Sequence, residues 1–351
     1  MKNRLGTVLA FGLVMVLGII LLTACAAPAE PAVPPPAAPS SVAPSPTVPI
    51  PAAPSPVVPS PATPPVVAPS PAATFPIEIT DQLGRVVKLK KAPQRIISLS
   101  PSNTEILFSL GLGDRIVGVD QYSDYPSEAK TKAIIGGFST TNVEKVVALN
   151  PDLIVAGSIH QPKVIPVLES LGFTVVGLDP KTIEEVLGAI TLVGKITGEQ
   201  ATANQVVAGL SSRIKAVTDK TSNLSESRKP RVFYLVWTTP LMSSGNGSFQ
   251  ADLIQKAGGI NIAQAINGFA TISIEAVIAA NPEVMITDDQ SMSGGGANAQ
   301  FINTDPRLAN TAARKNNQVF TVTSGFISHS GPRLVDALEQ FAKLIHPELF
   351  K

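Results

Sequence analysis

The spacing of apolar residues changes repeatedly along the last three-quarters of the chain. Short runs of β-branched residues alternate with stretches in which apolar residues recur every three or four positions. The runs predict buried strands and the stretches predict amphipathic helices, and their alternation is typical of parallel βαβ units. In the first half, the predicted strands are 95–98, 116–119, 153–156 and 174–178, with helices at 104–110 and 183–197.

A long helical stretch without proline follows. It runs from about residue 199 to 221, with an apolar stripe formed by Val206, Val207, Leu210, Ile214 and Val217. Strand and helix patterns then resume. We expect strands at 232–237, 284–287 and 319–322, and helices at 249–257 and 332–345.

One segment occurs twice. Residues 143–157 align without gaps with residues 274–288, and five of the 15 positions are identical, among them the glutamates Glu144 and Glu275. Each copy has the pattern of a short helix, an Asn-Pro break and a buried strand. Independent occurrence of this common pattern is the alternative to a true repeat. We predict an α/β fold of two similar Rossmann-like lobes with parallel sheets, residues 77–198 and 230–351. A single helix, 199–221, bridges them, and a ligand cleft lies between them.

The N-terminus has the pattern of a bacterial lipoprotein leader. Lys2 and Arg4 precede an apolar stretch, which ends in Leu22-Thr23-Ala24-Cys25. This ending resembles the lipobox, in which the cysteine is lipidated and becomes the first residue of the mature chain. We therefore expect a signal peptide at 1–25 and lipidation of Cys25. An uncleaved membrane-spanning helix is the alternative.

Residues 26–76 have a different composition from the rest of the chain. They contain 19 of the 32 prolines and one charged residue, Glu30. Such a segment cannot bury a core, and its prolines favour extended polyproline II. We expect a disordered Pro/Ala/Ser-rich stalk that separates the membrane from the folded lobes.

Charge and cysteine content exclude several function classes. The formal net charge is +1, which gives no electrostatic footprint for nucleic acid. With one cysteine and three histidines, the chain lacks the ligands of zinc ribbons, disulfide scaffolds and metal-cluster enzymes. No set of nucleophile, base and orienting residue stands out, so we expect a binding protein with no catalytic residues, no resident metal and no cofactor of its own.

The folded part resembles the substrate-binding proteins of bacterial ABC importers for cobalamin, haem and ferric siderophores. The matching segments are 95–113, 116–120, 124–126, the two glutamate-containing repeats and Gly331-Pro332-Arg333. The resemblance covers residue 77 to the C-terminus. It implies two lobes joined by one long helix, small lobe closure, and an extracytoplasmic monomer that works with a permease dimer and its ATPase subunits. Anchoring to either a periplasmic or an outer cell-surface membrane face remains open.

The resemblance also implies roles for individual residues. Glu144 and Glu275, one per lobe, match glutamates that dock onto basic residues of the permease. A glutamate favoured at a helix N-terminus by the helix dipole is the structural alternative for each. In cobalamin-binding members of this family, the positions of Tyr125 and Phe138 hold aromatic residues at the ligand, and the stretch around Trp237 lines the opposite wall.

Other candidate ligand-binding residues follow from position in the predicted sheets. Ligands of α/β proteins bind beyond the carboxyl ends of strands, where Phe326, His329, Ser102 and Asn103 also fall. Aromatic walls would suit a large flat macrocycle. Core packing of the aromatic residues, and helix capping by the Ser102–Asn103 pair, are the plainer interpretations.

The ligand is left among three classes. A cobalamin-type corrinoid comes first, because few arginines are available to pair with an anionic ferric siderophore. Haem is the third possibility, in which Tyr125 and His329 would be axial iron ligands. An enzyme on a similar bilobal frame and a structural surface lipoprotein are remote alternatives.

Overall fold

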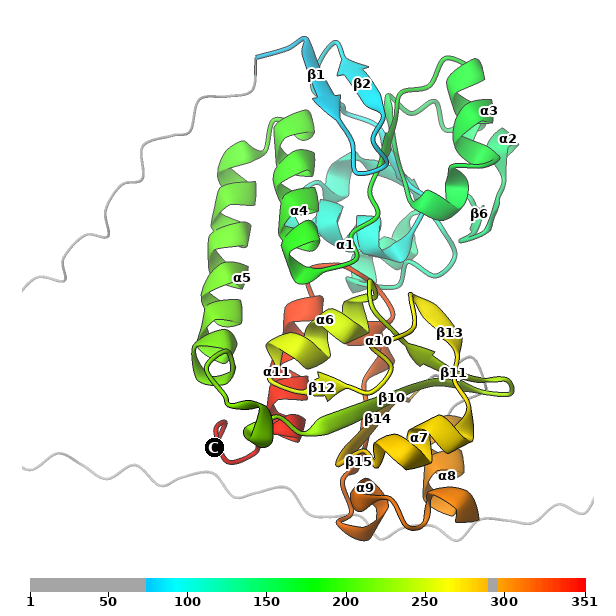
Figure 1. Ribbon diagram of the computed structural model, residues 1–351. Helices are drawn as coiled ribbons and strands as arrows, with labels where there is room; N and C mark the ends of the chain where they lie inside the picture. Colours follow the sequence, from blue (N-terminus) through cyan, green and yellow to red (C-terminus); the bar gives the residue numbers. More distant parts are fainter. Residues whose placement is uncertain (1–73, 290–295) are drawn as a thin grey trace, which may run out of the picture. The chain divides into compact units, whose positions relative to one another are not determined.

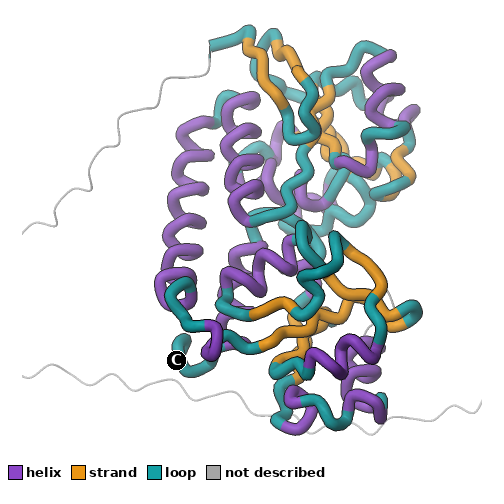
Figure 2. Tube along the Cα trace, in the orientation of Figure 1, coloured by secondary structure: helices purple, strands orange, loops and turns teal. Residues whose placement is uncertain are grey.

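The computed structural model describes residues 74–289 and 296–351. The predicted signal peptide, Cys25 and nearly all of the predicted stalk lie outside the described residues. Within them, two β-sheets with helices on both sides form two lobes (Figures 1 and 2). We call the elements from β1 to α4 the first lobe and those from β10 to α11 the second lobe.

The first lobe is built on a five-stranded parallel sheet in the order β5-β4-β3-β8-β9. Its strands are β3 (Ile96–Ser98), β4 (Ile116–Val119), β5 (Ala133–Ile134), β8 (Leu153–Ala156) and β9 (Val175–Gly177). Two small antiparallel pairs flank it: β1 (Ile77–Thr80) with β2 (Val86–Leu89), and β6 (Gly136–Gly137) with β7 (Thr140–Thr141). The helices are α1 (Pro101–Ser109), α2 (Val143–Ala148), α3 (Val164–Ser170) and α4 (Ile183–Thr197).

The second lobe has a mixed six-stranded sheet. Its strands are β10 (Arg231–Thr238), β11 (Leu241–Ser244), β12 (Ile260–Asn261), β13 (Phe269–Thr271), β14 (Val284–Asp288) and β15 (Val319–Val322). Its helices are α6 (Phe249–Lys256), α7 (Ile274–Ala280), α8 (Ala297–Thr304), α9 (Ala312–Lys315), α10 (Ser324–Ile327) and α11 (Leu334–Ile345).

The second sheet has the predicted parallel strands at its centre and differs from a parallel sheet at one edge. Strands β11 and β13 run antiparallel to their neighbours, whereas β12, β14 and β15 are parallel. Only Thr239 and Pro240 separate β10 from β11. A two-residue connection can only join antiparallel neighbours, because a parallel crossover needs a dozen residues or more.

Helix α5 (Gln200–Thr221) connects the lobes. Its 22 residues give a length of about 33 Å, and it lies along one side of the molecule, against α4 of the first lobe and α11 of the second (Figure 1). Arg213 in the middle of α5 pairs with Asp336 and Glu339 of α11. The bridging helix is thereby tied to the second lobe by charge as well as by packing.

The buried residues explain how the lobes are held together. Successive strand residues face opposite sides of a sheet, and strands β3, β8, β10 and β14 are buried on both faces, as parallel strands between helix layers must be. One face of each sheet packs into a shared core that also includes α1, α4, α5, α6 and α11. The outer faces form separate cores with α2 and α3 in the first lobe and with α7 and α8 in the second.

The repeated segment has the same structure in both lobes. It forms α2 and β8 in the first copy and α7 and β14 in the second. The αL residues that end the two helices, Asn150 and Asn281, have the same φ of 44°. Arg95 and Arg231 each donate hydrogen bonds to carbonyls at the end of the repeated helix. The predicted repeat is therefore structural. It includes an arginine that lies outside the aligned segments 143–157 and 274–288 and bonds the end of the helix.

Candidate functional site

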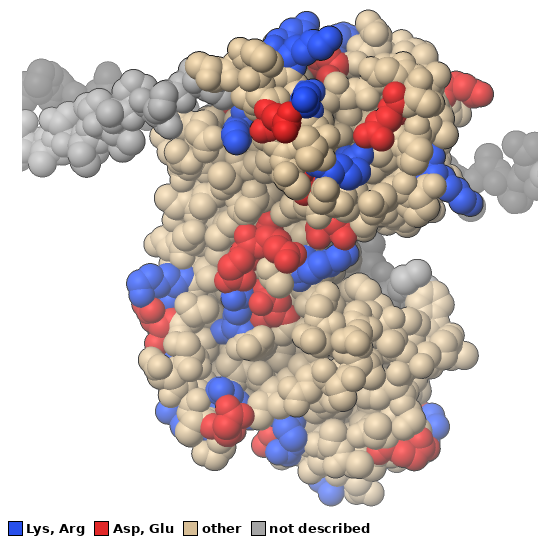
Figure 3. Space-filling view, turned by 45° about the horizontal axis from the view of Figure 1, so that its top comes forward, with Lys and Arg blue, Asp and Glu red and all other residues tan. Residues whose placement is uncertain are grey.

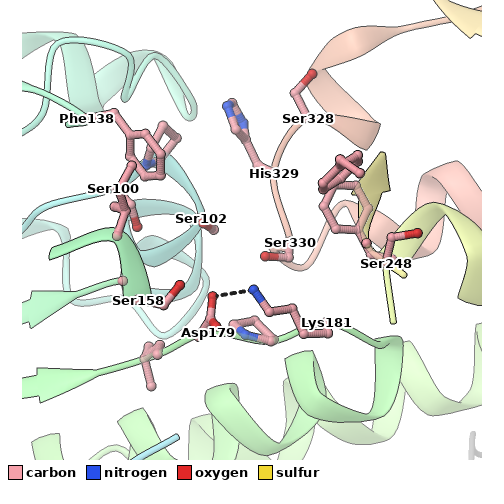
Figure 4. Close-up of a pocket in the computed structure, with 18 of the residues that line it drawn as sticks. Ser100, Ser102, Phe138, Ser158, Asp179, Lys181, Ser248, Ser328, His329 and Ser330 are labelled. Carbon is pink, nitrogen blue, oxygen red and sulfur yellow. Dashed lines mark hydrogen bonds and ion pairs between the residues drawn. The ribbon is translucent and has the colours of Figure 1, made fainter. Parts of the chain in front are cut away.

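A cavity of about 600 Å³ lies between the lobes (Figure 4). It is lined from the first lobe by the start of α1 and the loops after β4, β6, β8 and β9, and from the second lobe by the start of α6, the residues before β13 and the loop before α11. The residues with polar or aromatic side chains that line it are Ser100, Ser102, Tyr122, Phe138, Ser158, Asp179, Lys181, Ser248, Phe249, Phe269, Ser328, His329 and Ser330.

A buried polar network holds the start of α1 at the cavity. Thr104 hydrogen-bonds to Ser98 and Ser123, each at 2.8 Å, and Ser123 donates to Asp120. Burial raises the pKa of Asp120, although its hydrogen bonds from Ser123 and Tyr122 oppose this. The network fixes the end of β3, the first turn of α1 and the loop after β4 relative to one another, and this loop carries Tyr122 into the cavity wall.

Phe138 is supported by a histidine that the sequence analysis did not single out. His160 is 1 % exposed, and its ring lies edge-on to Phe138 at 5.8 Å. Its Nδ1 accepts from the backbone N–H of Gly157, so its Nε2 donates to the carbonyl of Phe138 at 2.8 Å. Burial lowers the pKa of His160. The neutral imidazole therefore joins two segments of the first wall.

The second lobe supplies its own aromatic wall. Phe249 and Phe269 line the cavity and pack edge-to-face with ring centres 6.1 Å apart. Phe249 is the first residue of α6, and Ser248 caps that helix by accepting from Ala251 N–H. The cap and the ring contact together set where the Phe249 ring lies.

The charges of the cavity balance. Among the described residues that line it, Lys181 is the only one with a permanent positive charge, and its Nζ lies 2.8 Å from Asp179 Oδ1 (Figure 4). Six serines and His329 supply further hydrogen-bonding groups. The wider surface likewise mixes charges of both signs on the face seen in Figure 3. The cavity thus offers hydroxyl groups and aromatic rings with no net charge from the Asp179–Lys181 pair.

His329 lies at the boundary between the cavity and a buried ion pair. Its Nδ1 is 3.4 Å from Glu105 Oε1, and the same oxygen accepts from Arg333 at 2.5 Å. Burial disfavours the charged form of Arg333, but the hydrogen bond and negative charge of Glu105 raise its pKa above the ordinary value. The Arg333 guanidinium also lies 3.8 Å from the centre of the Tyr125 ring.

The structure brings some of the predicted ligand-binding residues together and separates others. Ser102, Phe138 and His329 line the cavity. Asn103 is buried beside Ser102, within the first turn of α1 and behind the cavity surface. The predicted N-cap at these residues is displaced, because helix α1 starts earlier and Ser100 occupies the N-cap position.

The remaining predicted aromatic residues lie elsewhere. Tyr125 lines a second hollow together with Arg333 and Arg213, so Tyr125 and His329 do not face one cavity. Trp237 lies on β10 and donates from Nε1 to the carbonyl of Thr239, and Phe326 packs against the shared core. Neither lines the cavity. Strand-end position predicted the region of these residues but not the direction in which each ring points.

Glu144 and Glu275 are exposed at equivalent positions of α2 and α7. Asn142 and Ser273 cap the two helices in the same way, by accepting from the backbone N–H three residues later. Both helices lie on the side of the molecule away from α5 (Figure 1). Each lobe therefore presents one carboxylate on the same small structural unit.

Several cavity residues were not predicted from the sequence. Phe249 was assigned only to a helix, and Asp179, Lys181 and Phe269 were not considered as site residues. The signal for Phe249 was available, because Ser248 is a helix-capping residue at the end of a strand-connected loop. His160 ends a short turn after β8 and His346 ends α11, and both side chains are buried.

The described residues contain neither a membrane-spanning helix nor a cluster of metal-binding side chains. In residues 74–289 and 296–351, no helix combines the length and the apolar character that crossing a membrane requires. The same residues contain no group of three or more His, Cys, Asp or Glu side chains placed to hold a metal ion.

Comparison with protein families gives one match over most of the folded part. The model of a family described as "Periplasmic binding protein" matches residues 96–325. The ABC transporter substrate-binding lipoprotein YvrC of Bacillus subtilis is 32% identical over 285 residues, which are 79% of this chain and 88% of that protein.

Two solved structures illustrate the range of ligands among similar proteins. The periplasmic vitamin B12-binding protein BtuF of Vibrio cholerae has a TM-score of 0.63 and 27% identity, over 73% of this chain and 97% of its own. The periplasmic haem-binding protein RhuT of Roseiflexus sp. RS-1 has a TM-score of 0.64 and 26% identity, over 72% of this chain and 98% of its own.

Proposed function

Because this chain belongs to the periplasmic binding protein family, we propose that it captures a cobalamin-type corrinoid in the cavity between its lobes and delivers it to an importer. It is the substrate-binding protein of an ABC transporter, and the proteins that it resembles are named for binding rather than for catalysis. A permease and its ATPase subunits are the partners that this role requires.

The character of the cavity carries the choice of ligand. Its aromatic side chains come from both lobes, and its serines offer hydroxyl groups that can donate to and accept from amides. Cobalamin is a large macrocycle with neutral amide side chains around its rim. A volume of about 600 Å³ lies within the range of about 300–1,000 Å³ for small-molecule sites. A corrinoid is larger than the cavity, so part of it would remain outside.

A ferric siderophore or haem is the alternative ligand. The similarity to the haem-binding protein of Roseiflexus favours keeping it. The charge balance weighs against it, because carboxylate or catecholate groups in a buried site need cationic partners. Lys181, the permanent cation among the described lining residues, is already paired with Asp179.

The attachment to the membrane and to the permease is part of the same proposal. Cys25 would carry the lipid anchor at the end of a signal peptide, 1–25, and residues 26–76 would be the stalk. Glu144 and Glu275 would dock the two lobes, 77–198 and 230–351, onto a two-fold permease. Their exposure and equivalent surroundings support this role.

A calorimetric titration of the full-length chain tests the ligand. The panel contains cyanocobalamin, haemin, a ferric catecholate and a ferric hydroxamate. We expect saturation by cyanocobalamin with a Kd below about 1 μM, equivalent to about 8 kcal/mol. Replacing Phe249 by Ala should weaken this binding about tenfold, because one aromatic contact contributes about 1 kcal/mol beyond its buried area.

A matched aromatic substitution distinguishes contact from general destabilisation. Phe350→Leu removes a ring that contacts Lys220 and the shared core but does not line the cavity, so it should leave the Kd unchanged. Saturation by haemin or a ferric chelate alone would replace the corrinoid by the alternative ligand. Absence of binding across the panel would contradict both.

A further inference from the structure

Two segments that support the family resemblance meet across the lobe boundary, and their contact has no role in the proposed function so far. The first is the 95–113 segment, which includes Glu105 on α1. The second is Gly331-Pro332-Arg333, just before α11. Arg333 Nη2 donates to Glu105 Oε1 at 2.5 Å, although 228 residues separate the two in sequence.

This ion pair is buried, unlike most ion pairs on the molecule. The side chains of Glu105 and Arg333 are 3 % and 15 % exposed. Rings from both lobes lie against the guanidinium: Tyr125 at 3.8 Å and Phe326 at 5.9 Å. A buried charge without its partner is strongly unfavourable, so the two lobes are held in the one register that keeps the pair intact.

The glycine of the second segment is part of the same arrangement. A Cβ atom at Gly331 would lie 2.8 Å from Glu105 Oε2 and 3.3 Å from Glu105 Cβ. Gly331 therefore lets the backbone of the second lobe approach the carboxylate closely. A Cβ at this position would require the Glu105 carboxylate to shift, so Gly331→Ala disturbs the pair while both charges remain.

The pair also lies directly behind the cavity. Glu105 Oε1 is 3.4 Å from His329 Nδ1, and His329 lines the cavity together with Ser328 and Ser330. These residues occupy the loop between α10 and α11, and in Figure 4 they lie opposite Phe138 and Ser100. The ion pair between Glu105 and Arg333 thus holds this wall of the cavity in place relative to the wall of the first lobe.

We propose that Glu105 is a positioning residue for the ligand site, which holds the Ser328–Ser330 wall of the second lobe in place from the first lobe through its ion pair with Arg333. This role rests on the proposed function, because it assumes that the cavity binds the ligand. Glu105 touches no ligand itself. It determines the spacing between the two walls that do.

A second ionic contact across the lobes provides the control. Lys256 of α6 pairs with Glu184 of α4 at 2.6 Å, but the Glu184 side chain is 63% exposed. Breaking an exposed pair of this kind costs little. Glu184→Gln therefore removes an ionic contact across the same boundary without touching the loop that carries His329.

Hydrogen–deuterium exchange in the full-length, ligand-free chain is the first measurement. The variants are Glu105→Gln, Gly331→Ala and Arg333→Lys, with Glu184→Gln as the control. In the first two, we expect amides of residues 324–334 to exchange at least about tenfold faster, while β10 and β14 keep their protection. Arg333→Lys keeps the charge but loses the planar guanidinium against Tyr125, so its effect should be smaller.

Cyanocobalamin titration of the same variants is the second measurement. The Kd should rise about tenfold in Glu105→Gln and Gly331→Ala and stay within about twofold in Glu184→Gln. Unchanged exchange at 324–334 in both Glu105→Gln and Gly331→Ala would overturn the proposal. So would an equal increase over both sheets, which is the mark of general destabilisation. Faster local exchange in a protein that binds nothing on the panel would support the positioning role and contradict the proposed function.

Discussion

At the scale of single residues, the cavity depends on polar groups that are buried behind its surface. His160 has no contact with the cavity in the described structure, yet it bonds the loops that carry Phe138 and Gly157. Asp120 and Thr104 have a similar place behind Ser102 and Tyr122. Because buried polar groups are costly when unpaired, each such bond restricts the wall to one arrangement.

The buried His160 predicts an acid-dependent loss of stability. Its pKa in the folded protein lies below the ordinary value of about 6.5. As the pH falls below 6.5, the unfolded chain therefore binds a proton that the folded chain does not, and the free energy of unfolding decreases. The part of the free energy of unfolding that depends on a neutral His160 is fully present above pH 6.5. Chemical denaturation at several pH values between 7.5 and 5 measures it.

The His160→Gln variant separates this histidine from other titrating groups. Its amide can still donate to the Phe138 carbonyl but cannot take up a proton. We expect its free energy of unfolding to fall less steeply between pH 6.5 and 5 than that of the wild type. Parallel pH profiles for the two proteins would contradict the role given to His160.

At the scale of elements, the repeated helix–turn–strand unit is the most regular part of the fold. In both copies, a capped short helix ends at an asparagine in the left-handed conformation, and an arginine donates to the last carbonyls. Asp152 and Glu283 in turn accept from the backbone N–H of Arg95 and Arg231. The unit thus satisfies its own backbone groups at the point where the chain turns from helix to strand.

The two asparagines predict different results for the same substitutions. Asparagine tolerates the left-handed conformation because its short polar side chain can hydrogen-bond locally, whereas this conformation costs other residues with a Cβ about 1–2 kcal/mol. Asn150→Ala and Asn281→Ala should therefore both lower the free energy of unfolding, by at most about this amount. Asn281 also accepts from Ala312 N–H at 2.8 Å, and losing that bond adds about 1 kcal/mol.

Glycine variants separate the two causes. Asn150→Gly should be close to neutral, because glycine adopts the same backbone conformation without strain. Asn281→Gly should keep the cost of the lost hydrogen bond. Urea denaturation of the four variants measures both effects, and equal losses for Asn150→Gly and Asn150→Ala would contradict the backbone explanation.

Helices and strands were predicted best where the apolar pattern of the sequence is compatible with one structure only. Helix 183–197 matches α4, and strands 116–119, 153–156 and 319–322 match β4, β8 and β15 residue for residue. The antiparallel hairpin of β10 and β11 was missed because no apolar alternation sets off residues 241–244. The cavity was predicted in part, since strand ends locate loops but side-chain direction within a loop depends on distant contacts such as that between Glu105 and Arg333.

At the scale of the whole molecule, the lobes share one continuous core. It runs from β3 and β8 through α4, α5 and α11 to β10 and β14. Relative movement of the lobes would expose or repack part of that core, so the structure favours a small change of cleft width on binding. We therefore expect a partner that releases the ligand to bind both lobes.

Removing the charges of the two exposed glutamates should weaken binding to the permease. In vesicles containing the permease and its ATPase, Glu144→Gln/Glu275→Gln should reduce ligand-dependent ATP hydrolysis at least about tenfold. The Kd for the ligand should stay unchanged, since neither residue lines the cavity. Glu128→Gln, which removes another exposed carboxylate, is the matched control. Equal activity of the double variant and wild type would contradict docking through these residues.

The repeated unit also bears on the history of the chain. Two copies that share a helix, a turn, a strand and an arginine bonded to the helix end are what the duplication of a half-length gene would leave. Both copies carry an exposed glutamate, whereas the aromatic residues that line the cavity differ between the lobes: Tyr122 and Phe138 in the first, and Phe249 and Phe269 in the second. A new cargo can therefore be accommodated by substitutions in the walls of one lobe that leave both glutamates, and any docking through them, unaltered.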